Sequence, residues 1–237
     1  MINFRFAYLF GTFIFGLIWL LIFVKRKDLR KEQLYMGTLI GLAGFTEPLF
    51  YGSYWSPQFF ISLPNINIGI ESILLCFFYG GIASTLYEFI FNEILKKTSR
   101  ESKKERTLET LLSIFIGITV SLFCWSIFKI NFIYATTYGM LSVGFTLIFF
   151  RKDLFASCLI NGIIMAILSF IVLYIFGQVF SGIFNLWWRL DLLSGLRIFE
   201  IPFEEIMWHF ALGFAAGPMY EVWKGYSDYK ISRGSGT

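Results

Sequence analysis

Residues 69–88 read GIESILLCFFYGGIASTLYE, and residues 202–221 read PFEEIMWHFALGFAAGPMYE. Both stretches are apolar, are about as long as a helix that crosses a bilayer, and carry an acid near each end. Aligned without a gap, they are identical at seven of twenty positions, including both acids and one glycine. Acids are costly inside a membrane, so two helices rarely share them through composition alone. The pair therefore predicts an internal duplication.

A second element of the sequence repeats as well. Arg26-Lys27-Asp28-Leu29 recurs as Arg151-Lys152-Asp153-Leu154, each time after the apolar run that lies two before a repeated stretch. Three apolar runs in the first half therefore match three in the second half, with one run between them. Both triplets then cross the membrane in the same direction, which predicts a pseudo-twofold axis along the membrane normal. We expect Gly80 and Gly213 to let the two repeated helices cross closely; packing against another neighbour is the alternative.

The whole chain has the composition of an integral membrane protein. Apolar residues make up 57% of the 237 residues, 30 are Phe, and the mean hydropathy is +0.67. We predict an all-α membrane fold with about seven transmembrane helices. The runs long enough to span a bilayer are 5–24, 34–51, 68–93, 108–128, 130–150, 154–180 and 203–223.

These runs predict one membrane domain, residues 1–231, in a 3+1+3 arrangement. Repeat one covers 5–93, repeat two covers 130–223, and the linker helix 108–128 separates them. Residues 232–237 have the composition of a flexible tail. The first run has no small-residue cleavage site before the basic residues that follow it, so we interpret it as a retained helix and not as a signal peptide.

The basic residues predict the orientation in the membrane. Sixteen of the 20 Lys and Arg residues fall on one side of the predicted spans. The positive-inside rule assigns this side to the cytoplasm, with the N-terminus outside, as in a multi-pass protein of the cell (inner) membrane. Tyr54-Trp55 and Trp187-Trp188, in the two longer outer segments, are typical of interfacial aromatic belts. The charges form no continuous basic stripe, so the sequence does not predict nucleic-acid binding.

The sequence carries few signals for a cofactor or a metal. Cys76, Cys124 and Cys158 lie inside apolar runs without CxxC spacing, and we interpret them as packing residues. The chain has one histidine, His209, so a metal site is not expected. No dinucleotide fingerprint, P-loop or His-Glu-x-x-His string occurs, and we expect no bound cofactor. The sequence alone does not indicate an oligomeric state.

Six acids lie in the predicted spans, in two layers. The outer layer is Glu47, Glu71, Glu204 and Glu205, and the inner layer is Glu88 and Glu221. Acids in a membrane normally face an interior cavity or a partner. Glu204 and Glu205 project about 100° apart on a helix, so their roles should differ, whereas His209 lies one turn after Glu205 on the same face. A packing role for His209, and an interfacial cap or ion-pair role for the inner acids, are the alternatives.

Ile201-Pro202-Phe203-Glu204-Glu205, which opens an apolar helix, resembles the Pro-x-Glu-Glu/Asp motif of the membrane-integral lycopene cyclases. These enzymes consist of two subunits in some bacteria and are fused in archaea and fungi, and their duplicated three-span layout is similar too. The first repeat departs from the motif, because Gly69-Ile70-Glu71-Ser72 lacks the proline and the second acid.

The resemblance implies a carotenoid cyclase, an intramolecular lyase or isomerase that acts by acid–base chemistry without redox change. A carboxyl would protonate the terminal alkene of a hydrophobic carotenoid or isoprenoid taken from the bilayer, and a proton would leave after ring closure. It implies Glu204, Glu205 and Glu71 as catalytic residues. The residues expected at the substrate are His209, Trp208, Phe210, Phe77 and Glu47.

Two other classes of protein fit the same pattern. A 3+1+3 repeat also describes small transporters, and a noncatalytic lipid-binding or accessory protein could keep the fold. A pocket that opens laterally to lipid favours a hydrophobic substrate, whereas a water-filled path to both faces favours transport.

Overall fold

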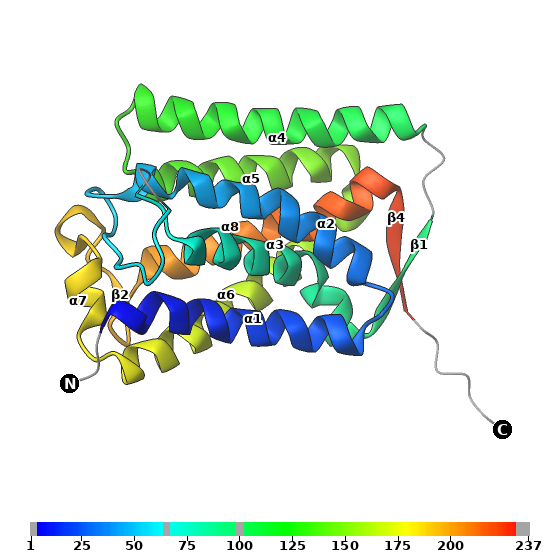
Figure 1. The fold of residues 1–237 in the computed structure, drawn as a ribbon. Coiled ribbons are helices and arrows are strands. Elements are labelled where there is room, and N and C mark those ends of the chain that lie inside the picture. Colours follow the sequence, from blue (N-terminus) through cyan, green and yellow to red (C-terminus); the bar gives the residue numbers. More distant parts are fainter. Residues whose placement is uncertain (1–3, 64–66, 98–101, 231–237) are drawn as a thin grey trace.

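The computed structural model describes residues 4–63, 67–97 and 102–230 and is mostly helical (Figure 1). A helix lies in each predicted apolar run. The long helices run in nearly the same direction, with α8 inside the bundle and α4 at one edge of it (Figure 1). In chain order they are α1 (Ala7–Lys25), α2 (Arg30–Gly41), α3 (Ile70–Phe91), α4 (Lys103–Ser126), α5 (Phe132–Phe150), α6 (Phe155–Val179) and α8 (Phe203–Lys224).

Short elements lie at the two ends of the bundle. At one end are α7 (Ile183–Trp187) and the strands β2 (Arg197–Ile198) and β3 (Ile201–Pro202), which pair with each other. At the other end are β1 (Glu93–Lys97) and β4 (Tyr226–Lys230). The 3-10 helices are η1 (Phe4–Phe6), η2 (Leu42–Phe50), η3 (Lys152–Leu154) and η4 (Leu190–Leu192). The predicted flexible tail, 232–237, lies outside the described residues.

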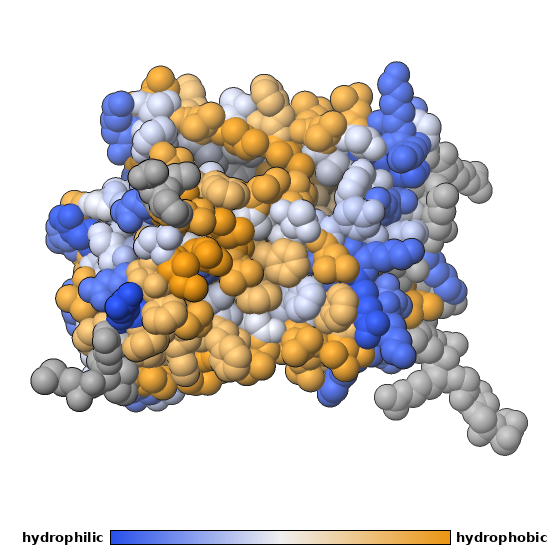
Figure 2. Space-filling model, in the orientation of Figure 1, coloured by the Kyte–Doolittle hydropathy of each residue, from blue (hydrophilic) through white to orange (hydrophobic). Residues whose placement is uncertain are grey.

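The described part of the chain holds five helices long and apolar enough to cross a membrane. They lie at Phe4–Lys25, Ile70–Phe91, Lys103–Ser126, Phe132–Phe150 and Lys152–Val179. Figure 2 shows hydrophobic side chains over the middle of the bundle and hydrophilic ones at its two ends, as expected for a membrane protein. The predicted spans 34–51 and 203–223 fall outside this set, because the first is a short α-helix followed by a 3-10 helix and the second carries several charges.

The second helix of the first half is broken where its counterpart is continuous. The α-helix α2 ends at Gly41 and continues as η2, which contains Pro48, whereas α6 runs unbroken for 25 residues. Proline has no N–H to donate and its ring crowds the preceding turn, which disfavours an α-helix there. Gly44 lies so close to α3 that a Cβ would come within 2.7 Å of the Ile73 Cα. The break turns Glu47 inward, where its side chain is buried.

The repeated arginines make equivalent contacts in the two halves. Arg26 and Arg151 directly follow α1 and α5, and each forms a two-pronged ion pair with the aspartate two residues later. The Arg26 hydrogen bond lowers the pKa of Asp28. Arg26 also donates to the Glu93 carbonyl at 2.5 Å, and Arg151 donates to the Tyr226 carbonyl at 3.1 Å. Glu93 and Tyr226 are the first residues of β1 and β4. Each arginine therefore connects the end of the helix before it to the first residue of the strand in its own half.

The strand pair between the two halves was not predicted. The helices α3 and α8 both end at a left-handed residue, Asn92 and Gly225, and β1 and β4 follow directly. The strands pair antiparallel with Leu95 opposite Asp228, which are equivalent positions in the two repeats. Equivalent residues that face each other in an antiparallel pair are related by a local twofold axis. The predicted repeats end at residues 93 and 223. The structural correspondence continues beyond these ends into β1 and β4.

The shared glycines contact the second helix of their own half. A Cβ on Gly80 would lie 2.5 Å from the Met36 carbonyl oxygen of α2, and a Cβ on Gly213 would lie 2.8 Å from the Asn161 carbonyl oxygen of α6. The expected close crossing of α3 and α8 at these glycines is therefore wrong. Near these glycines the two halves are joined by Asn161, whose amide donates to the carbonyls of Ala83 and Gly213 at 2.6 and 2.8 Å.

We predict that Gly80→Ala and Gly213→Ala each lower the free energy of unfolding by about 1–3 kcal/mol, because overpacking moves two helix backbones apart. Gly11→Ala is the matched control, since a Cβ there meets only the Phe176 ring at 3.8 Å. Thermal unfolding in detergent measures the effect. Equal stability of all three variants would contradict the close packing of the two glycines.

Candidate functional site

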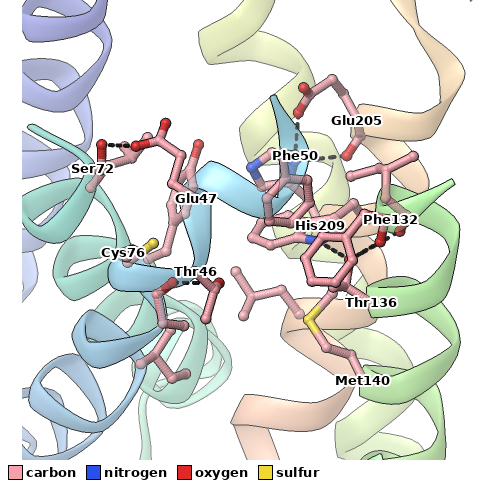
Figure 3. Close-up of a pocket in the computed structure, with 18 of the residues that line it drawn as sticks. Thr46, Glu47, Phe50, Ser72, Cys76, Phe132, Thr136, Met140, Glu205 and His209 are labelled. Atoms are coloured by element: carbon pink, nitrogen blue, oxygen red, sulfur yellow. Dashed lines mark hydrogen bonds and ion pairs between the residues drawn. The ribbon is translucent and has the colours of Figure 1, made fainter. Parts of the chain in front are cut away.

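A cavity of about 650 Å³ lies among the helices of the bundle, and Trp187 of α7 and Trp188 line part of it. Its wall is formed by side chains from α1, α2, η2, α3, α4, α5, α6 and α8, and most of them are apolar. Two carboxyls, Glu47 and Glu205, line it from opposite sides (Figure 3). His209 lines the cavity on the Glu205 side. The cavity thus combines a hydrophobic volume with a small number of acid–base groups.

The Glu205 carboxyl is held by donors from two outer segments. Its Oε1 accepts a hydrogen bond from the Tyr54 hydroxyl and one from Trp188 Nε1 at 2.8 Å. Tyr54 follows η2, and Trp188 directly follows α7. Burial raises the pKa of Tyr54 well above its ordinary value, so its hydroxyl remains a donor. Both donors approach one oxygen, and Oε2 receives neither.

The Glu47 carboxyl has a separate set of donors. Its Oε1 accepts from the Tyr8 hydroxyl of α1 at 2.8 Å, and its Oε2 accepts from the Ser72 hydroxyl of α3. The side chain is 5% exposed. Each oxygen of this buried carboxyl therefore has a hydrogen-bond donor. Glu47 stands as a second buried carboxyl across the cavity from Glu205.

His209 is a buried residue of α8 whose side chain lines the cavity. It is 1% exposed, and its Nδ1 is 2.7 Å from the Glu205 backbone oxygen and 3.7 Å from Glu205 Oε2. The rings of Tyr79 and Trp208 meet it edge to face. Among the described residues, its buried Nε2 has no hydrogen-bond partner. The expected stacking of His209 on the Glu205 turn is confirmed.

Glu204 and Glu71 are equivalent acids that brace the outer loops. Glu204 Oε1 accepts from the Tyr134 hydroxyl at 2.5 Å and from the Ser194 amide at 2.8 Å. Glu71 Oε1 accepts from the amides of Phe60 and Ile61 at 2.7 and 3.1 Å. Neither acid is among the described residues that line the cavity. The structure therefore brings Glu205 and Glu47 together at the cavity, and places these two beside it.

The aromatic residues expected at the substrate divide into two groups. Trp208 lines the cavity, and its Nε1 donates to the Thr136 hydroxyl at 3.2 Å. Phe77 instead packs against Gly37 of α2, and Phe210 packs against Gly162 of α6, which are again equivalent contacts in the two halves. Neither Phe77 nor Phe210 lines the cavity in the described part of the chain. Their observed positions are helix-packing positions.

The outer tryptophans and Tyr54 are not an interfacial belt. Tyr54, Trp187 and Trp188 are each at most 5% exposed. They pack with Tyr8 and other rings into a cluster above the cavity, and two of them serve the Glu205 carboxyl. The belt interpretation is wrong for these three residues, because all three rings are buried and the polar atoms of Tyr54 and Trp188 bond to the buried Glu205 carboxyl.

Sequence reasoning missed Tyr8, Tyr54, Ser72 and Trp188 as site residues. The repeat alignment held one signal for Ser72, because it occupies the position of Glu205 in the other half. In the structure this serine donates to Glu47, so the first half supplies its acid from η2 in place of α3. The inner acids Glu88 and Glu221 are buried near the far ends of α3 and α8 and do not line the cavity.

The cavity opens at the bundle surface between η2 and α4. Several residues both line it and are exposed: Leu39, Leu42 and Leu49 on one side, and Ile118 and Leu122 on the other. All five side chains are aliphatic. In a membrane, an opening with this lining faces lipid chains.

Comparison with known proteins bears on the second half of the chain. Residues 131–223 match the family model for lycopene cyclase. The lycopene cyclase match begins at Asn131, the residue that caps α5, and includes Glu204, Glu205 and His209. This part of the chain is therefore similar to lycopene cyclases, and the five apolar helices indicate a membrane protein. No curated protein and no solved structure matches the chain.

In the described residues, no group of three or more His, Cys, Asp or Glu side chains is placed to hold a metal ion. The three cysteines are free, and Cys76 lines the cavity beside Glu47 (Figure 3).

We predict that Glu71→Ala speeds hydrogen exchange at the Phe60 and Ile61 amides by about 10- to 100-fold, because each loses its carboxylate acceptor. Glu200→Ala is the control, since its carboxyl is largely exposed and pairs only with Arg197 among the described residues. Hydrogen-exchange mass spectrometry measures both. Unchanged exchange at residues 60 and 61 would contradict the bracing role.

Proposed function

We propose that this protein cyclises the end group of a carotenoid or related isoprenoid by acid–base chemistry, without redox change. The observation that carries the proposal is the apolar cavity with two opposed carboxyls, Glu47 and Glu205. The lycopene cyclase match covers the half that supplies Glu205. Such a reaction needs a proton donor, a dry apolar site and stabilisation of a carbocation, and it needs no external reactant.

Glu205 is the proton donor in this proposal. Its Oε1 already accepts two hydrogen bonds, so Oε2 is the oxygen that carries the proton. In this proposal Glu205 enters the cycle as the carboxylic acid, and Tyr54 and Trp188 hold its carboxyl at the cavity. Proton transfer to the terminal alkene creates a carbocation, and attack by the neighbouring double bond closes the ring.

Glu47 and the aromatic rings stabilise the cation in this proposal. The Glu47 carboxylate faces the Glu205 side from across the cavity (Figure 3). Tyr79, Phe50 and Trp208 line the space between, and ring faces attract positive charge. Glu204 and Glu71 act as positioning residues, because their carboxyls hold the backbones of the outer loops. This differs from their expected role as catalytic acids.

We propose that the chain spans the inner membrane seven times, as 3+1+3 with the N-terminus outside. The five apolar helices supply most of the spans, and the equivalent contacts of Arg26 and Arg151 support two matched triplets. The hydrophilic side chains at both ends of the bundle in Figure 2 support a bundle that crosses the bilayer from one end to the other. The reaction site then lies toward the outer leaflet, and the substrate enters from lipid between η2 and α4.

The test is expression in a lycopene-accumulating bacterial host, with chromatography of the extracted pigments. We expect cyclic products from the wild type and a loss of about 10²- to 10⁴-fold in Glu205→Gln, which cannot donate a proton. Glu204→Gln and Glu71→Gln are the matched controls: their amide oxygens still accept from the loops, so they should lose less. Glu47→Gln should fall between these, because it removes a charge and not the proton donor.

Unchanged lycopene beside folded, abundant protein would contradict the cyclase proposal. Linear carotenoid that copurifies with the protein would then point to a noncatalytic binding protein.

We predict that Ala43→Trp lowers kcat/KM by about tenfold, equivalent to about 1.4 kcal/mol, because its ring narrows the opening beside η2. Ala156→Trp is the matched control, since Ala156 is an exposed alanine of α6 that does not line the cavity. Cyclisation is measured in liposomes with substrate dissolved in the bilayer. Equal rates for the two variants would show that the substrate uses another path.

A further inference from the structure

The surroundings of His209 determine which of its ring nitrogens carries the proton. Nδ1 lies 2.7 Å from the Glu205 backbone oxygen, which can only accept a hydrogen bond. In the neutral ring, Nδ1 is therefore the donor and Nε2 is an unprotonated acceptor. The two nitrogens lie at different edges of the ring, so Nε2 points away from the helix turn that Nδ1 contacts.

The Nε2 atom is a buried acceptor without a donor in the described residues. His209 lines the apolar cavity and is 1% exposed, and the residues around its ring, Phe15, Tyr79 and Trp208, present ring edges or faces. Buried polar atoms in folded proteins are nearly always hydrogen-bonded, and the exceptions concentrate at functional sites. An unpaired imidazole nitrogen at the wall of the cavity has a free lone pair that can receive a proton.

We propose that His209 Nε2 is the base that takes the proton released when the ring closes. This inference rests on the proposed cyclase function and assigns the second proton transfer of that reaction. In the first transfer, the Glu205 O–H bond breaks and a C–H bond forms at the terminal alkene. In the second, a C–H bond beside the cationic carbon breaks, its electron pair becomes the ring double bond, and the proton moves to Nε2.

After one cycle Glu205 is a carboxylate and His209 is an imidazolium with a proton on each ring nitrogen. Nδ1 and Glu205 Oε2 are 3.7 Å apart, within ion-pair distance, so transfer of the Nδ1 proton to Oε2 restores the acid. The proton left on Nε2 is then given up to water and Nδ1 takes one from water after the product leaves, which restores the base in its starting tautomer. Donor and base lie one helical turn apart on α8, so both face the same end of the substrate.

Glu47 is less suited to be this base. Both of its oxygens already accept hydroxyl hydrogen bonds, from Tyr8 and Ser72, on the opposite side of the cavity. A proton arriving there would share an oxygen with one of these donors, whereas the Nε2 lone pair accepts no hydrogen bond in the described residues. The structure thus separates three tasks: Glu205 donates, His209 accepts, and Glu47 contributes a negative charge.

The test uses the full-length protein in liposomes that contain lycopene, in buffer made with D2O. The wild type should give cyclic product labelled at the protonated carbon. His209→Gln should cyclise about 10²- to 10⁴-fold more slowly. It should still exchange deuterium into the recovered linear substrate, because Glu205 protonates the alkene and the cation returns a proton to it. Ser169→Ala, a buried polar change on α6 away from the cavity, should behave as the wild type.

A second variant keeps the proposal testable if His209→Gln fails to fold. His209→Ala leaves a space beside Tyr79, and added imidazole should restore part of the cyclisation rate. The assignment is overturned if His209→Gln cyclises within about threefold of the wild type, or if it loses deuterium exchange together with cyclisation while remaining folded. A wild type that neither cyclises nor labels lycopene overturns the proposed function itself, and the base with it.

Discussion

The Glu205 carboxyl lies in an apolar cavity, where it must have hydrogen-bond donors to remain buried. Its donors come from the segment after η2 and from the end of α7, which are 134 residues apart in the chain. Bringing Tyr54 and Trp188 to one oxygen draws both outer segments over the end of the bundle and buries their aromatic rings. The positions of Tyr54 and Trp188 over this end of the cavity therefore depend on one carboxyl.

The two halves of the molecule share a frame but differ at the site. Helix ends, arginine contacts and glycine packing correspond closely, and the strands β1 and β4 join the halves about a local twofold axis. At the cavity, Ser72 and Cys76 stand where the second half has Glu205 and His209. The broken helix α2–η2 compensates by bringing Glu47 to Ser72. The two halves thus form a symmetric scaffold whose walls at the cavity are unlike.

Much of the fold could be predicted because long apolar runs in lipid have few alternatives to a helix. The helix from Phe203 and the contact of His209 with the Glu205 turn follow from local spacing. The strand pair could not be predicted, because residues 93–97 become a strand only by contact with 226–230. The break in α2 had local signals at Gly41, Gly44 and Pro48, but the apolar composition of 34–51 outweighed them.

The sequence by itself determined the membrane-type helices, the duplication, and the acids near their outer ends, since each follows from composition and spacing along one helix. Only the tertiary structure decided which acids meet the cavity. Glu71, Glu204 and Glu205 lie at similar depths, yet two brace loop amides and one faces the interior, because a helix position does not specify which neighbour will cover it. Hydrogen-bond donors far away in the chain make that choice, and their approach depends on how all the helices pack together.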